Sequence, residues 1–186
     1  MFDWDLTLWN SWDIHLSLMN QTADVLGYPR PPPADLGKEY SRPFFQHMAW
    51  FFPGDQEKVV ETYMGFYYAA VWQERRLYPG VLELLQQLKQ DGYSTAILSD
   101  KRQMFGVPEF EYSNMIVAVD NAQFFADGMA AKPEPDGLQD VMRSLGVLPG
   151  ECLFVGDSHR DIECAQRAGA WSGAALWASV ERERVL

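Results

Sequence analysis

Short apolar runs alternate along the chain with stretches whose apolar residues recur at helical spacing. Apolar runs without polar alternation are typical of strands that are covered on both faces of a sheet. They predict strands over residues 93–99, 116–119, 152–155 and 174–177, and a further strand that ends at Met1-Phe2-Asp3. Helical spacing occurs over residues 81–88, 138–145 and 162–168, and each stretch stops close to a glycine, a residue suited to helix ends. The alternation predicts an α/β fold with a Rossmann-like parallel sheet.

The stretch from residue 13 to residue 78 shows helical periodicity and no strand pattern. Ile14, Leu18 and Val25 fall on one helical face that ends at Gly27, and Asp55 is placed to cap a second helix. We therefore expect an all-helical domain, residues 13–78, inserted after the first strand into a core of residues 1–12 and 79–186. Its aromatic residues are expected to form the core of a small bundle, or in part to line a substrate pocket: Trp50, Phe51, Phe52, Tyr63, Phe66, Tyr67, Tyr68 and Trp72.

The composition limits the classes of function. The 186 residues carry a formal net charge of −11, which argues against partners such as nucleic acid or an anionic membrane surface. No apolar run approaches the roughly 20 residues that span a bilayer, and Asp3 and Asp5 stand where a secretory signal would be basic. Cys152 and Cys164 lie among apolar neighbours, so we expect two buried thiols and a cytoplasmic protein, either a monomer or a homodimer.

Polar residues that can carry chemistry stand at the predicted carboxyl ends of the strands. They are the pair Asp3 and Asp5, then Ser99, then Lys132, and last the pair Asp157 and Asp161. Each alone has an ordinary interpretation as a cap, turn or surface residue. Together they fall on the edge where open α/β sheets bind ligands. Carboxylates suit Mg²⁺, and a lysine held in a Pro-rich turn suits a phosphate group.

This order of motifs resembles the haloacid dehalogenase superfamily, and within it the phosphoglycolate-phosphatase-like phosphatases with a helical cap. The resemblance covers essentially the whole chain. The segments that are similar to the family's motifs are Asp3-x-Asp5-x-Thr7, Ser99, Lys132 and Gly156-Asp157-Ser158-x-x-Asp161, with Tyr78-Pro79-Gly80-Val81 as the return from cap to core.

The resemblance implies a Mg²⁺-dependent phosphatase that hydrolyses a small phosphorylated metabolite, such as phosphoglycolate or a sugar phosphate, through an aspartyl-phosphate. Asp3 would be the nucleophile, and Asp5 would be the general acid and base. Mg²⁺ would be held by Asp3, the backbone carbonyl of Asp5, and Asp157. Ser99 and Lys132 would bind the phosphoryl oxygens.

Further roles follow from the same resemblance. Thr7 would order the first loop, and Asp161 would act on the metal through water. The helical cap would choose the leaving group, and its candidate substrate contacts are Arg30, Lys38, Arg42 and His47, each of which also has an ordinary surface interpretation.

Two alternative functions stay open: a non-enzymatic phospholigand-binding protein with the same fold, and a phosphomutase. Asp5 favours phosphoryl transfer over dehalogenation. The sequence departs from similar proteins at Leu6, where glycine is common, and at Asp100, where asparagine is usual. We expect Leu6 to narrow the pocket mouth and Asp100 to pair with Lys101 or Arg102. A central strand normally has about five residues, whereas only Met1 and Phe2 precede Asp3. We therefore expect a lower free energy of unfolding than in a relative with a longer first strand.

Overall fold

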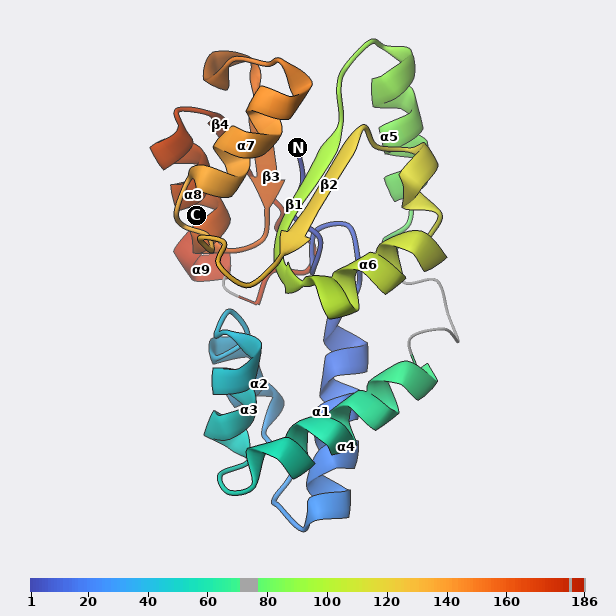
Figure 1. Ribbon diagram of the computed structural model, residues 1–186, viewed down its shortest axis with the longest axis vertical. Coiled ribbons are helices and arrows are strands. Elements are labelled where there is room, and N and C mark those ends of the chain that lie inside the picture. Colours follow the sequence, from blue (N-terminus) through green and yellow to red (C-terminus); the bar gives the residue numbers. More distant parts are fainter. Residues whose placement is uncertain (71–76, 181, 186) are drawn as a thin grey trace. The chain divides into compact units, whose positions relative to one another are not determined.

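The computed structural model describes residues 1–70, 77–180 and 182–185. Two compact units make up the chain: Met1–Asn10 together with Arg76–Leu186, and Ser11–Arg75. Every strand of the described residues belongs to the first unit, and the second unit is helical (Figure 1).

The first unit is built on parallel strands. β1 (Ala96–Arg102) pairs in parallel with β2 (Asn121–Phe125), and β3 (Leu153–Gly156) pairs in parallel with β4 (Trp171–Ala174). In Figure 1, β1 and β2 lie side by side, with helices packed around them. The parallel pairing confirms the α/β fold class.

Phe2 joins the two strand pairs. It forms parallel bridges to Ile97 of β1 and to Val155 of β3. The Asp3 N–H donates to the Val155 carbonyl at 2.8 Å, and the Phe2 N–H donates to the Ala96 carbonyl at 2.9 Å. The N-terminal segment therefore lies between β1 and β3, where the sequence predicts the strand ending at Met1-Phe2-Asp3, but within the described residues it forms only bridges at Phe2 and no strand of its own.

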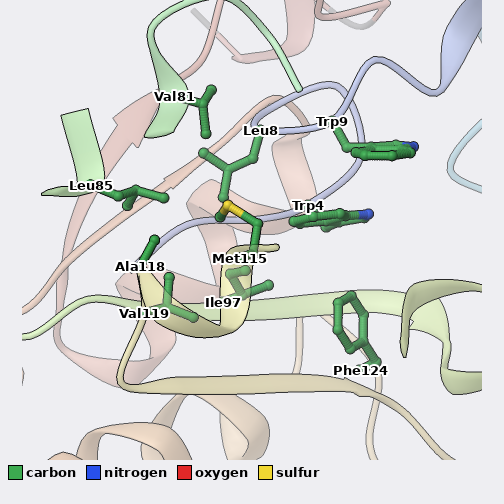
Figure 2. Close-up of a cluster of buried hydrophobic side chains, with 10 residues drawn as sticks. All are labelled: Trp4, Leu8, Trp9, Val81, Leu85, Ile97, Met115, Ala118, Val119 and Phe124. Atoms are coloured by element: carbon green, nitrogen blue, oxygen red, sulfur yellow. The ribbon is translucent and has the colours of Figure 1, made fainter. Parts of the chain in front are cut away.

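Both faces of the sheet are covered. Ile97 and Leu98 are both buried, but in different clusters, because successive side chains of a strand point to opposite faces. Figure 2 shows the first cluster, which contains Trp4, Leu8, Trp9, Val81, Leu85, Ile97, Met115, Ala118, Val119 and Phe124. The second contains Leu98, Leu138, Met142, Cys152, Phe154, Cys164, Ala165 and Ala168. The two cysteines are buried free thiols, as predicted.

The helices of the first unit connect the strands. They are α5 (Val81–Gln90), α6 (Gln103–Tyr112), η1 (Met115–Val117), α7 (Asp136–Leu145), η2 (Pro149–Glu151), α8 (His159–Ala168) and α9 (Arg182–Val185). The helices predicted over residues 81–88, 138–145 and 162–168 are confirmed as α5, α7 and α8. α7 and α8 end at Gly146 and Gly169, whose φ angles of 67° and 76° suit glycine.

Two of the predicted strands are wrong in position. The apolar run at 116–119 contributes to the 3₁₀ helix η1, with Ile116 65% exposed, and the strand follows it as β2. Its residues Asn-Ala-Gln-Phe-Phe carry little apolar pattern, because β2 lies at the edge of the sheet and only Phe124 is buried. The sequence predicts the last strand over 174–177, but β4 ends at Ala174, because the parallel register places Trp171 beside Leu153 and Ala174 beside Gly156.

The second unit consists of α1 (Trp12–Leu26), α2 (Pro33–Lys38), α3 (Phe44–Phe51) and α4 (Gln56–Ala70). α4 packs against both α1 and α3. Ile14 and Leu18 are buried on α1, but Val25 is 64% exposed, so the predicted face does not extend to the end of the helix. The Asp55 carboxylate accepts from the Lys58 N–H at 3.2 Å, which confirms the predicted cap.

The aromatic residues of this unit only partly form its core. Phe52, Tyr63 and Tyr67 are buried, whereas Trp50 and Tyr68 are 60% and 48% exposed. Trp72 lies outside the described residues. No helix in the described ranges is both long enough and apolar enough to cross a membrane.

Candidate active site

Four of the predicted site residues meet at the carboxyl ends of the central strands. Asp3 follows the Phe2 bridge, Asp157 follows β3, and Asp161 lies in the first turn of α8. Lys132 reaches them from the loop between β2 and α7, and its Nζ donates to Asp3 Oδ1 at 2.8 Å and to Asp161 Oδ1 at 2.6 Å. All four side chains are buried. The arrangement is one ammonium among three carboxylates.

The β3–α8 turn fixes Asp161. Its Oδ2 accepts from the Ser158 N–H at 3.0 Å and from the Ser158 hydroxyl at 2.6 Å, while Ser158 caps α8 in return. A Cβ on Gly156 would stand 2.3 Å from the Asp161 Cγ. Only glycine therefore leaves room for the Asp161 carboxyl group at this position.

Burial and mutual repulsion dominate the electrostatics of the cluster. Burial raises the pKa of Asp3 to about 7, although Lys132 lowers it and Asp161 raises it further. Burial, and then the neighbouring Asp3 and Asp161, hold the pKa of Asp157 well above its ordinary value. The neighbouring carboxylates raise the pKa of Lys132, whereas burial lowers it, so the ammonium stays charged. With the carboxylates ionised, one lysine leaves an uncompensated negative charge.

The donor set fits a divalent cation. One carboxylate oxygen from each of Asp3, Asp157 and Asp161 lies within 4.8 Å of the others. Three hard oxygen donors in a negative, buried cluster are the ligand chemistry that Mg²⁺ prefers. Asp161 lies beside Asp3 and Asp157, and its action on the metal through water stays a prediction.

Asp5 does not join this cluster through its side chain. Its Oδ1 accepts from Lys101 Nζ at 2.8 Å, and the same ammonium lies 2.8 Å from Oε2 of the buried Glu109. Neither Lys101 nor Glu109 was identified from the sequence as part of a site. The sequence offers one signal for each as a site residue. Lys101 stands two residues after Ser99, and Glu109 is the single acid among the mostly apolar residues 103–110.

Ser99 and Thr7 are both buried. In the sequence, Ser99 stands two residues before Lys101 and Thr7 two residues after Asp5. Ser99 Oγ accepts from the Lys101 N–H at 3.2 Å. The Thr7 hydroxyl has no hydrogen-bond partner among the described residues, while the Thr7 carbonyl accepts from the Trp177 indole at 3.1 Å. Leu6 is fully buried, so the expectation that it narrows a pocket mouth is wrong, because its side chain packs in the core.

Asp100 is paired differently from the expectation. Its Oδ2 lies 3.0 Å from Arg160 Nη2, and its Oδ1 accepts from the Lys132 N–H at 3.0 Å. Arg160 also donates to the Lys132 carbonyl. The expected pairing with Lys101 or Arg102 is wrong, because Lys101 is held by Asp5 and Glu109. Asp100 and Arg160 thus hold the backbone of Lys132 from both sides.

The four candidate contacts in the helical unit are engaged by partners within that unit, and Arg42 and His47 share one of them, Glu39. Arg30 pairs with Asp24 at 2.6 Å, Lys38 pairs with Asp35 at 3.3 Å, and Arg42 donates from Nε to Glu39 at 2.8 Å. His47 is 3% exposed, and its Nδ1 and Nε2 lie 2.9 Å from the Glu39 carbonyl and 3.1 Å from His15 Nε2. A substrate role for these four stays a prediction.

Comparison with known proteins finds a family match over most of the chain. The sequence model of the haloacid dehalogenase-like hydrolases matches residues 1–175. A curated relative, the pyrophosphatase PpaX of Bacillus cereus strain AH820, is 34% identical over 100 residues, 54% of this chain and 46% of that protein. The chain thus matches about half the length of this curated relative.

Solved structures share the fold over nearly the full length. A predicted phosphoglycolate phosphatase from Haemophilus somnus 129PT has a TM-score of 0.83 at 22% identity, and the match covers 98% of this chain and 89% of that one. CbbY from Rhodobacter sphaeroides, solved with xylulose-(1,5)-bisphosphate, has a TM-score of 0.75 at 19% identity, covering 92% and 82%.

Proposed function

Because this chain belongs to the haloacid dehalogenase-like hydrolase family, we propose that it is a Mg²⁺-dependent phosphatase of a small phosphorylated metabolite. The observation that carries the proposal is the buried cluster in which Lys132 contacts both Asp3 and Asp161, with Asp157 alongside. So many acids around one lysine need a cation before a phosphate dianion can approach.

In this proposal Asp3 attacks the phosphorus and forms an aspartyl-phosphate, which water then hydrolyses. Lys132 binds a phosphoryl oxygen, since its ammonium is held between carboxylates in a buried position. Ser99, a buried residue of β1, donates a further hydrogen bond to the phosphoryl group. When bound, Mg²⁺ supplies positive charge that offsets the charge of the phosphate and the acids.

Asp5 protonates the leaving oxygen in the first step and accepts a proton from water in the second. Its carboxylate is bound by Lys101 and is not one of the three carboxylates that lie within 4.8 Å of one another, which supports a separate role. Asp3, Asp157 and the backbone carbonyl of Asp5 would hold the cation. Asp161, whose Oδ2 is bound by Ser158 and whose Oδ1 is bound by Lys132, would position the lysine and the metal.

The substrate class comes from the relatives. Phosphoglycolate and a sugar bisphosphate are named for solved structures of the same fold. Inorganic pyrophosphate is a second candidate, because the relatives at 33–34% identity are described as pyrophosphatases. The helical unit would select among these, and the protein would act in the cytoplasm.

The test is hydrolysis of p-nitrophenyl phosphate with Mg²⁺ by the unchanged chain and by Asp3→Asn. We expect the substitution to abolish turnover, because the amide cannot form the acyl phosphate. Equal rates in the two proteins would overturn the proposal. Phosphate release from phosphoglycolate, sugar phosphates and pyrophosphate then identifies the substrate, and binding without turnover would favour a phospholigand-binding protein instead.

A further inference from the structure

Glu109 is a buried acid that the proposed chemistry does not use. It lies on α6 and is 1% exposed. It is the one acidic residue of that helix whose side chain is buried. Burying a carboxylate costs several kcal/mol unless charged or polar partners compensate it. Its partners therefore indicate what it does.

One carboxylate oxygen of Glu109 contacts both Trp4 and Lys101. Oε2 accepts from the Trp4 indole N–H at 2.8 Å and pairs with Lys101 Nζ at 2.8 Å. Trp4 is fully buried, and its ring stacks on Trp9 with the centroids 5.3 Å apart (Figure 2). The first contact thus anchors Trp4, the residue between Asp3 and Asp5. The second contact is to Lys101, which in turn contacts Asp5.

Lys101 connects Glu109 to Asp5. Its Nζ lies 2.8 Å from a carboxylate oxygen of each, and its side chain is 12% exposed. A lysine with one partner is free to rotate about its flexible stem, whereas two fixed acceptors restrict the ammonium to one place. Because Glu109 is fixed by Trp4, Lys101 is held where it can orient the Asp5 carboxylate.

We infer that Glu109 is a positioning residue for Asp5, acting through Lys101, and that it orients the acid that protonates the leaving group. This inference rests on the proposed function and deepens it. The oxygen Oδ1 of Asp5 is engaged by Lys101, so the other oxygen is the one left to carry the transferred proton. An acid that is misoriented donates its proton poorly, and the loss is greatest where the leaving group most needs protonation.

The test compares two aryl phosphates of similar shape with Mg²⁺. p-Nitrophenyl phosphate has a leaving group that departs with little protonation, and phenyl phosphate has one that needs the acid. In Glu109→Gln we expect kcat/KM for phenyl phosphate to fall about tenfold more than kcat/KM for p-nitrophenyl phosphate. The glutamine oxygen can still accept from Trp4, so the variant keeps that hydrogen bond.

Three further variants separate positioning from folding. Glu111→Gln makes the same change of charge at an exposed position of the same helix and should leave both substrates unaffected. Lys101→Gln should show the same selective loss, and combining it with Glu109→Gln should add no further selectivity, because the two residues act in series.

The outcomes are distinct. Equal losses on both substrates, or no loss, in Glu109→Gln would overturn the inference while the proposed function stands. Full additivity in the double variant would overturn the action through Lys101. Absence of turnover by the unchanged chain would overturn the proposed function and with it the inference.

Discussion

Leu6 adopts a backbone conformation that side chains rarely take. Its φ is 56°, and the other non-glycine residue with positive φ among the described residues is Asn114, a type that tolerates it. The Leu6 N–H donates to the Trp9 carbonyl at 2.9 Å, which closes the loop after Asp5. The side chain is fully buried. The loop geometry therefore suits glycine, while the core position favours leucine.

Two substitutions at Leu6 separate these preferences. Leu6→Ala loses the buried side chain and keeps the strain, so we expect it to lower the free energy of unfolding by about 3 kcal/mol. Leu6→Gly loses the same burial but relieves about 1–2 kcal/mol of left-handed strain, against about 0.5–1 kcal/mol of added chain entropy. Glycine should thus be the more stable variant in urea unfolding. An alanine variant of equal or greater stability would contradict this reading of the loop.

The helices of the second unit share one directed chain of hydrogen bonds. The Glu39 carbonyl can only accept, so His47 Nδ1 carries a proton and donates to it at 2.9 Å. In neutral His47, Nε2 then accepts from His15 Nε2 at 3.1 Å, and His15 Nδ1 accepts from the Tyr63 hydroxyl at 3.1 Å. The chain runs from α4 through α1 to α3 with every donor matched to an acceptor.

A proton added to His47 would set two N–H groups against each other. Burial lowers the pKa of His47 from its ordinary value of 6.5, with nearby Arg42 acting in the same direction and the Glu39 contacts acting against it. The unfolded chain then takes up the proton first, so stability is lost as the pH falls from 6.5 towards the lower folded-state pKa.

Imidazole proton NMR checks this, since the chain has three histidines. We expect His47 to titrate below 6.5, and Tyr63→Phe, which removes the first donor of the chain, to alter the titration. A His47 pKa at or above 6.5 would contradict the assignment of tautomers.

The elements of the core show what sequence patterns can predict. Buried apolar runs located β1 and β3, because a strand covered on both faces needs such a run. β2 has no such run, because its place at the edge is set by pairing with β1. Asp3, Lys132, Asp157 and Asp161 meet because strand ends converge, which sequence can anticipate.

The Asp5–Lys101–Glu109 contacts could not be anticipated in the same way. Asp5 and Lys101 are 96 positions apart in the sequence. The helix α6 carries no clear apolar face from which the orientation of Glu109 could have been predicted. Side-chain pairing between elements depends on packing angles that local periodicity does not encode.

At the scale of the whole molecule, the net charge of −11 includes several acids that the core buries. The pKa of Asp3 is raised to about 7, and that of Asp157 is also raised, mainly by burial. Such acids hold protons more strongly in the folded chain than in the unfolded one. Without metal, the contribution of Asp3 to stability therefore falls as the pH rises from about 4 through about 7, and that of Asp157 changes in the same direction.

Magnesium should offset this loss of stability at high pH, because it binds the ionised carboxylates and competes with their protons. We expect saturating MgCl₂ to raise the melting temperature by about 5 °C at pH 8 and by much less at pH 5.5. NaCl of equal ionic strength is the control for screening, and Asp157→Asn, which removes one donor, should reduce the shift at pH 8. Because protons and Mg²⁺ compete for the same oxygens, an equal shift at both pH values would place the ion elsewhere than among Asp3, Asp157 and Asp161.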